Sequence, residues 1–212
     1  MSRHSHPRVR AVGRFTRLRA ILAGALVLGV GASVTLASWN DSETAAATFT
    51  AGRFDVVGSI DGGAFGQHPS SSGAALNFAV PVTGLGPGMT SYALFSVKTA
   101  NPSMAGTVTL AAAATNNTSG TGLGEYLTYG VKSIANGAAG GCTAAAFAAG
   151  ATVVAPGSAL TTGQAVGSSF LVTPNGANQV NYCFAVTMPA TVDNAAQGKT
   201  SAPIWTFTAV SG

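Results

Sequence analysis

The feature that most constrains the fold of this chain is a series of short stretches in which apolar and polar residues alternate, separated by Gly, Pro and Asn. Alternation with period two is typical of a β-strand with one buried face, and several short strands in succession are typical of antiparallel sheets. We therefore predict an all-β fold, a single antiparallel β-sandwich of jelly-roll type, with strands at residues 46–50, 53–59, 76–82, 91–99, 106–113, 126–134, 168–173, 179–188 and 202–210.

Gly52 separates the first two predicted strands. Ala47 and Phe49 share one face before it, whereas Phe54 and Val56 carry the apolar pattern after it, so the parity changes at the glycine. A glycine at such a change is typical of a bulge or a tight corner.

Two further local patterns predict a hairpin and a helix. Residues 91–99 and 106–113 flank a turn at 101–103, which favours pairing of these two strands. Residues 135–167 are almost all Ala, Gly, Thr and Ser and predict no strand, but the alanines of 143–149 favour a short helix.

The N-terminal residues have the pattern of an export signal. Residues 1–19 contain six arginines and no acid, and the 17 residues of 20–36 carry no charge. A basic segment followed by an apolar run and small residues is typical of a signal peptide. We predict a cleaved signal over 1–38, with a retained N-terminal anchor as the alternative, followed by an N-terminal strand or donor segment at 39–52 and the sandwich domain at 53–212. The predicted location is secreted, extracellular or at the cell surface.

The formal net charge of +4 is unevenly distributed along the chain. After Ser38, four basic residues oppose six acidic residues, which gives a net charge of −2. Nucleic-acid binding needs a basic surface, and here that surface would leave with the signal. We predict no nucleic-acid partner, and contact with a membrane only through the signal segment before cleavage.

The two cysteines, Cys142 and Cys183, predict a disulfide, because a lone pair in an exported protein is usually bonded. Cys183 lies on the face of its predicted strand opposite Tyr182 and Phe184. The bond should therefore hold the Gly/Ala-rich loop against the outer side of that strand. In the chain-entropy model, closing a loop of about 40 residues contributes roughly 4 kcal/mol.

Motifs at both ends of the chain resemble the TasA/camelysin group and related actinobacterial proteins with an alternate-type signal peptide. A glycine-spaced apolar run leads into W-N-D-S-E and A-T-F-T-A-G-R-F-D-V, and weaker matches follow at L-G-P-G, D-N-A-A-Q-G-K-T and W-T-F-T-A. The resemblance implies cleavage by a signal peptidase of the endoplasmic-reticulum type. The implied scissile bond joins Ser38 to Trp39, with the bond between Ala37 and Ser38 as the neighbour to exclude.

The resemblance also implies a structural role in extracellular matrix or surface fibres. In such an assembly, an extended N-terminal segment adds a strand to the sheet of a neighbouring subunit, and the open head-to-tail contacts give filaments. For this assembly strand we predict Trp39 and Phe49 as anchors, Ala47 and Ala51 at narrow positions, and Gly52 at its end. The expected partners are other copies or matrix proteins. The alternative is a monomeric cell-envelope module that binds a glycan or a protein.

Camelysin-type proteins have been classified as metallopeptidases, which raises the question of a zinc site. Catalytic zinc needs three protein ligands and an open position for water. After signal cleavage, His68 is the one histidine left, in a Pro/Ser loop with no acid within six residues. We therefore predict a solvated His68, no metal or cofactor, no catalytic residues and no enzyme activity.

Overall fold

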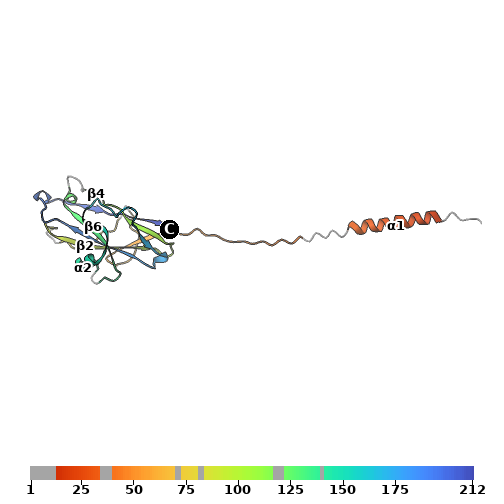
Figure 1. Cartoon of the computed structure of the whole chain (residues 1–212), viewed down its shortest axis with the longest axis horizontal. Helices are drawn as coiled ribbons and strands as arrows, with labels where there is room; N and C mark the ends of the chain where they lie inside the picture. The colour runs from red at the N-terminus through yellow and green to blue at the C-terminus, as the bar shows by residue number, and fades with distance from the viewer. Residues whose placement is uncertain (1–12, 34–39, 70–72, 81–83, 117–121, 139–140) are drawn as a thin grey trace, which may run out of the picture. The chain divides into compact units, whose positions relative to one another are not determined.

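The computed structural model describes residues 13–33, 40–69, 73–80, 84–116, 122–138 and 141–212 (Figure 1). The chain divides into two compact units, Met1–Phe49 and Thr50–Gly212. In the first unit, helix α1 (Gly13–Ser33) contains most of the predicted apolar run. Among the described residues, no helix combines the length and the apolar character needed to cross a bilayer.

The second unit, the β domain, is built on a five-stranded sheet in which every pair of neighbours is antiparallel. Its strands, in spatial order, are β1 (Val56–Ile60), β2 (Thr90–Thr99), β8 (Val180–Thr187), β5 (Thr128–Ile134) and β6 (Ala151–Ala159).

A second antiparallel sheet has the order β10 (Phe207–Ser211), β3 (Gly106–Leu110) and β7 (Phe170–Val172). A separate short ladder joins β4 (Ala114–Asn116) to β9 (Ala202–Ile204). The helical elements of the domain are α2 (Ala144–Ala149) and the single turns η2 (Leu123–Tyr126), η3 (Pro174–Gly176) and η4 (Asn194–Ala196). The prediction of a mostly β, antiparallel fold is thus confirmed.

The two sheets share one hydrophobic core. The ring of Phe207 in β10 lies 4.7 Å from Tyr182 in β8 and 5.1 Å from Phe95 in β2, measured between ring centroids. Phe170 in β7 meets Tyr182 edge-on at 5.7 Å. Tyr182 and Phe184 are completely buried. Aromatic side chains from both sheets therefore join them, because each ring removes a large apolar area from water.

Strand β8 is buried on both faces, and the disulfide explains why. Tyr182 and Phe184 face the shared core, while Cys183 points to the other side and is bonded to Cys142. This disulfide confirms the prediction from the sequence. It draws residues 141–150 over the outer face of the sheet, so that the whole strand from Val180 to Val186 is shielded from solvent.

Helix α2 covers the outer face of the five-stranded sheet and confirms the helix predicted at 143–149. Thr143 caps its start, since the threonine hydroxyl accepts a hydrogen bond of 3.2 Å from the N–H of Ala146. Phe147 packs against Tyr92 of β2 at 5.9 Å, and the ammonium of Lys132 lies 5.3 Å from the centre of the same ring.

The predicted strand at 46–50 is not found. Residues 40–55 contain no strand, and the strand predicted at 53–59 begins instead at Val56. No described strand forms backbone hydrogen bonds with residues 46–50. An extended segment without such bonds is not a β-strand. Gly52 does not join two strands but lies against Met104, where an added Cβ would come within 2.4 Å of the sulfur.

The predicted hairpin is also wrong, because β2 and β3 belong to different sheets. The turn at 101–103 crosses from one sheet to the other. It is held by contacts with distant segments: the Ser103 N–H donates to Asn175 Oδ1 (3.0 Å), and the Ser103 hydroxyl accepts from the Asp55 N–H (3.0 Å). These long-range bonds outweigh the local tendency of the two strands to pair.

Three further differences concern strand boundaries. Strand β6 lies in the region for which no strand was predicted, and the strand predicted at 202–210 is divided between β9 and β10. The strand predicted at 76–82 is not assigned over 76–80, and its last residues lie outside the described part of the chain.

Candidate functional site

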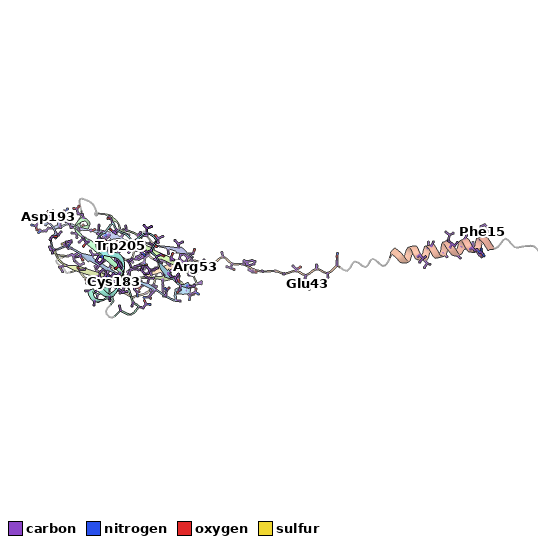
Figure 2. All side chains as sticks on the ribbon, in the orientation of Figure 1. Phe15, Glu43, Arg53, Cys183, Asp193 and Trp205 are labelled. Carbon is purple, nitrogen blue, oxygen red and sulfur yellow. A yellow bond between two sulfur atoms is a disulfide. The ribbon has the colours of Figure 1, made fainter. Side chains whose placement is uncertain are left out.

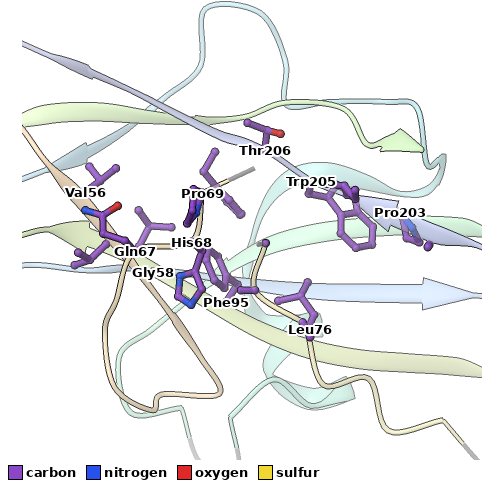
Figure 3. Close-up of a pocket in the computed structure, with 18 of the residues that line it drawn as sticks. Val56, Gly58, Gln67, His68, Pro69, Leu76, Phe95, Pro203, Trp205 and Thr206 are labelled. Carbon is purple, nitrogen blue, oxygen red and sulfur yellow. The ribbon is translucent and has the colours of Figure 1, made fainter. Parts of the chain in front are cut away.

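The described β domain contains an apolar groove of about 650 Å³. Its walls come from β1, β2, the 67–69 loop, residues 73–78 and the stretch 202–207 that contains β9 and the start of β10. In Figure 3, Val56 and Gln67 lie at one end of the groove, His68 and Phe95 near its middle, and Leu76 and Trp205 at the other end.

The groove exists because both sheets end beside it. Strand β1 is the outermost strand of the five-stranded sheet, and β10 is the outermost strand of the three-stranded sheet. Among the described residues, no strand joins these two edges into one layer, and core side chains such as Phe95 and Phe207 line an opening there. An open sandwich edge of this kind presents apolar side chains and backbone groups together.

Trp205 forms the aromatic end of the groove and is anchored in the core. Its ring lies 4.9 Å from Phe184, 5.7 Å from Tyr129 and 6.3 Å from Phe78. Burial raises the pKa of Tyr129 to about 12, and the neighbouring Trp205 indole acts in the opposite direction. Figure 2 shows Trp205 and Cys183 within the β domain, between Arg53 at one end and Asp193 at the other.

His68 is not the solvated loop residue that the sequence predicted. It is half-buried, and its ring meets Phe95 edge-on at 6.0 Å. Its Nδ1 atom is buried without a hydrogen-bond partner among the described residues. Gly58 makes room for this contact, since a Cβ there would lie 2.3 Å from the Phe95 ring and 3.2 Å from His68 Nδ1.

Within the described ranges, no three His, Cys, Asp or Glu side chains are grouped closely enough to hold a metal ion. The groove offers a concave apolar surface, and His68 is the one titratable side chain among the described residues that line it. A concave, mostly apolar site of this kind is suited to binding an apolar segment or ligand.

A small polar cluster of Arg53, Asp55 and Gln67 lies at the Gln67 end of the groove, near the start of the β domain. Asp55 accepts hydrogen bonds from Gln67 Nε2 (2.6 Å) and from Arg53 Nη2 (2.8 Å). The Gln67 bond first, and then the Arg53 guanidinium, lower the pKa of Asp55 from its ordinary value of 3.8. When Asp55 is ionised, the cluster therefore links the residues before β1 to the 67–69 loop by hydrogen bonds.

This cluster predicts a small acid sensitivity of the β domain. A carboxyl whose pKa is lowered by folding stabilises the native state above its unfolded pKa, and this contribution disappears as the pH falls through the folded pKa. Wild type should exceed Asp55→Asn in free energy of unfolding by a few tenths to about 1 kcal/mol near neutral pH. In urea titrations the difference should shrink as the pH falls below the ordinary Asp pKa of 3.8 and vanish once Asp55 is protonated in the folded state. Asp41→Asn, in the exposed segment before the domain, is the control and should show no such trend.

The predicted assembly residues are not gathered in this groove. Ala47 and Phe49 belong to the first unit, in the exposed segment 40–49, and the Phe49 side chain is 92% exposed. Ala51 and Gly52 belong to the second unit, just after its start at Thr50, and are exposed too. Ser38 and Trp39, the predicted cleavage residues, lie outside the described part of the chain.

The groove itself was not predicted, because its parts are far apart in the sequence. His68, Leu76, Phe95 and Trp205 come from four separate stretches that no local pattern connects. The available signal was the alternation of Trp205 and Phe207, which predicts that this face of the strand is apolar. It does not tell whether that face is fully covered by the core or lines a groove.

These features define an antiparallel β domain with one disulfide and an open apolar edge, and a disulfide in the fold is typical of proteins that mature outside the cytoplasm. No protein-family model matches the chain, and a comparison with curated proteins finds no match either.

Proposed function

We propose that this chain is an exported structural subunit, similar to TasA-like matrix proteins, which assembles into extracellular or cell-surface fibres by β-strand addition. The observation that carries the proposal is the apolar groove bounded by the outermost strands β1 and β10, of which β10 has no ladder partner on its outer edge among the described residues. An incoming strand would cover the apolar side chains and pair with a free backbone edge at the same time. The two sheets would then form a closed jelly-roll-type sandwich.

The proposed donor is the segment 39–52 of another copy. In its described part the alternate residues Ala47, Phe49 and Ala51 are apolar, and residues 40–52 are exposed. A phenylalanine that is 92% exposed leaves a large apolar surface in water. Burying it in the groove of a second copy would remove that surface, and every copy carries both a donor and a groove.

Signal cleavage would act as the switch for assembly. Before cleavage the donor is joined to the apolar signal segment, and after cleavage between Ser38 and Trp39 its end would be free. The contact is head-to-tail and does not close on itself, which gives filaments rather than a dimer. Under this proposal the protein is not an enzyme, and its partners are copies of itself or other matrix proteins.

The proposal predicts that assembly depends on the donor segment. The chain 39–212 should form filaments, whereas the chain 52–212 should stay monomeric, because it keeps the groove but lacks the donor. Phe49→Ala should reduce assembly about tenfold or more, since truncating a buried aromatic anchor costs upwards of 2 kcal/mol. Size-exclusion chromatography and negative-stain microscopy measure both effects.

Thr48→Ala is the matched control for Phe49→Ala, because residue 48 lies on the opposite face of the extended segment. It should assemble like wild type. If 39–212 and 52–212 are both monomeric under all conditions, assembly by strand addition is wrong, and the monomeric cell-envelope binding module becomes the better proposal.

A further inference from the structure

Residues 73–80 resemble a strand in their side chains but not in their backbone pairing. Ala74, Leu76 and Phe78 are half-buried and pack against the core, while the residues between them are exposed. This is the burial pattern of a strand that covers an apolar layer. Yet no described strand pairs with the segment, and its backbone bonds are local, from Phe78 N–H to Leu76 O (3.1 Å) and from Val80 N–H to Phe78 O (2.8 Å).

The segment lines the same groove as a free sheet edge. Residues 73–78 and the start of β10 both contribute to its walls, and Leu76 and Trp205 lie at the same end in Figure 3. Among the described residues, β10 pairs only with β3, so its outer edge has no ladder partner. By contrast, the outer edge of β1 is already in use, because Gly58 exchanges two backbone hydrogen bonds of 2.9 Å with Gly66.

We propose that residues 73–80 are a placeholder, which covers the core beside the groove in the monomer and is displaced when the donor segment of a second copy pairs with β10. This inference rests on the proposed function and adds the accepting edge and the element that controls access to it. The placeholder offers Ala, Leu and Phe at alternate positions, and the donor offers Ala, Phe and Ala with the same spacing. Both can therefore present apolar side chains to one groove.

The exchange is favourable because the donor segment can form backbone hydrogen bonds with β10. The placeholder covers part of the core with its side chains and pairs with no described strand, whereas a strand on β10 gains a ladder of main-chain hydrogen bonds in addition. The rate is limited by the opening of the placeholder, which has to withdraw Leu76 and Phe78 from the core. The monomer is thus protected from immediate assembly, and loosening the placeholder should speed the exchange.

The test uses a fluorescent peptide of residues 39–52 and the chain 52–212, which retains the complete described core and the disulfide. Association is followed by fluorescence anisotropy. With Leu76→Ser and Phe78→Ser combined, the peptide should bind about tenfold faster or more, because a larger fraction of the protein is open. Val80→Ser is the matched control, since Val80 is in the same segment but is 46% exposed, and it should bind at the wild-type rate.

Proteolysis reports displacement directly on the wild-type domain. Chymotrypsin should cut after Leu76 or Phe78 only when the peptide is bound, and a peptide with Phe49→Ala should neither bind nor cause cleavage. This readout remains decisive if the Leu76→Ser/Phe78→Ser variant does not fold.

The outcomes separate the two proposals. If the peptide binds while residues 73–80 stay protected, the placeholder is wrong and strand addition stands. If the peptide does not bind and the chain 39–212 does not assemble, strand addition itself is wrong and the placeholder fails with it.

Discussion

Replacing Phe184 with alanine should lower the free energy of unfolding of the β domain by about 3–5 kcal/mol, the range for truncating a buried phenylalanine. Phe184 is completely buried in β8, the central strand of the five-stranded sheet. Its ring lies 4.9 Å from Trp205 and 6.4 Å from Phe207, so it joins the central strand to the wall of the groove. Alanine would leave a cavity there that the rigid strands around it cannot close.

Urea unfolding followed by tryptophan fluorescence measures this effect, since Trp205 packs against the altered residue. Phe49→Ala is the matched control: the same chemical change at an exposed position should alter the free energy of unfolding by less than about 0.5 kcal/mol. A loss below about 1 kcal/mol for Phe184→Ala would show that the core is not packed as described.

Removing the disulfide should cost about 4 kcal/mol of stability. Cys142 and Cys183 are 41 residues apart in the sequence, and a cross-link over this distance reduces the entropy of the unfolded chain by that amount in the chain-entropy model. The combined Cys142→Ala and Cys183→Ala variant should therefore unfold at much lower urea concentration. The loop at 141–150 should become more accessible to proteases, because its other contacts with the sheet, such as the packing of Phe147 and the hydrogen bond from Lys132 Nζ to the Ala148 carbonyl (3.3 Å), are non-covalent.

Reduced wild-type protein is the natural comparison for this variant, because it loses the bond but keeps both sulfur atoms. The two should show nearly the same stability, and intact-mass measurement confirms the redox state of each sample. If the variant is as stable as the oxidised wild type, the loop does not contribute to the fold as the structure indicates.

The sequence predicted those features that depend on local pattern and on chemistry. Alternation located most of the strands, for example 126–134 and 179–188, because side chains on successive strand residues point to opposite faces. The presence of two cysteines predicted the disulfide, since an exported chain rarely leaves two thiols free. Alanine propensity alone predicted the short helix at 143–149, which the structure shows as α2.

Strand β6 was not predicted, because its sequence lacks the alternation of apolar and polar residues that is typical of a strand. Its sequence, A-T-V-V-A-P-G-S-A, contains two consecutive valines and no alternation over its full length. It also holds Pro156, which a strand tolerates at an edge or next to a bulge. Both conditions are met here, since β6 is the last strand of its sheet and its register with β5 shifts twice.

The sequence by itself determined the all-β class, the alternating faces, the disulfide and the uneven charge of this protein. Only the tertiary structure decided which strands pair, that residues 91–113 cross between sheets, that 73–80 covers the core without a ladder, and that an apolar groove opens between β1 and β10. The physical reason is that alternation records which side of a strand is buried, but not what buries it. Partners are chosen by contacts between residues distant in the chain, such as Ser103 with Asn175 and Phe207 with Tyr182.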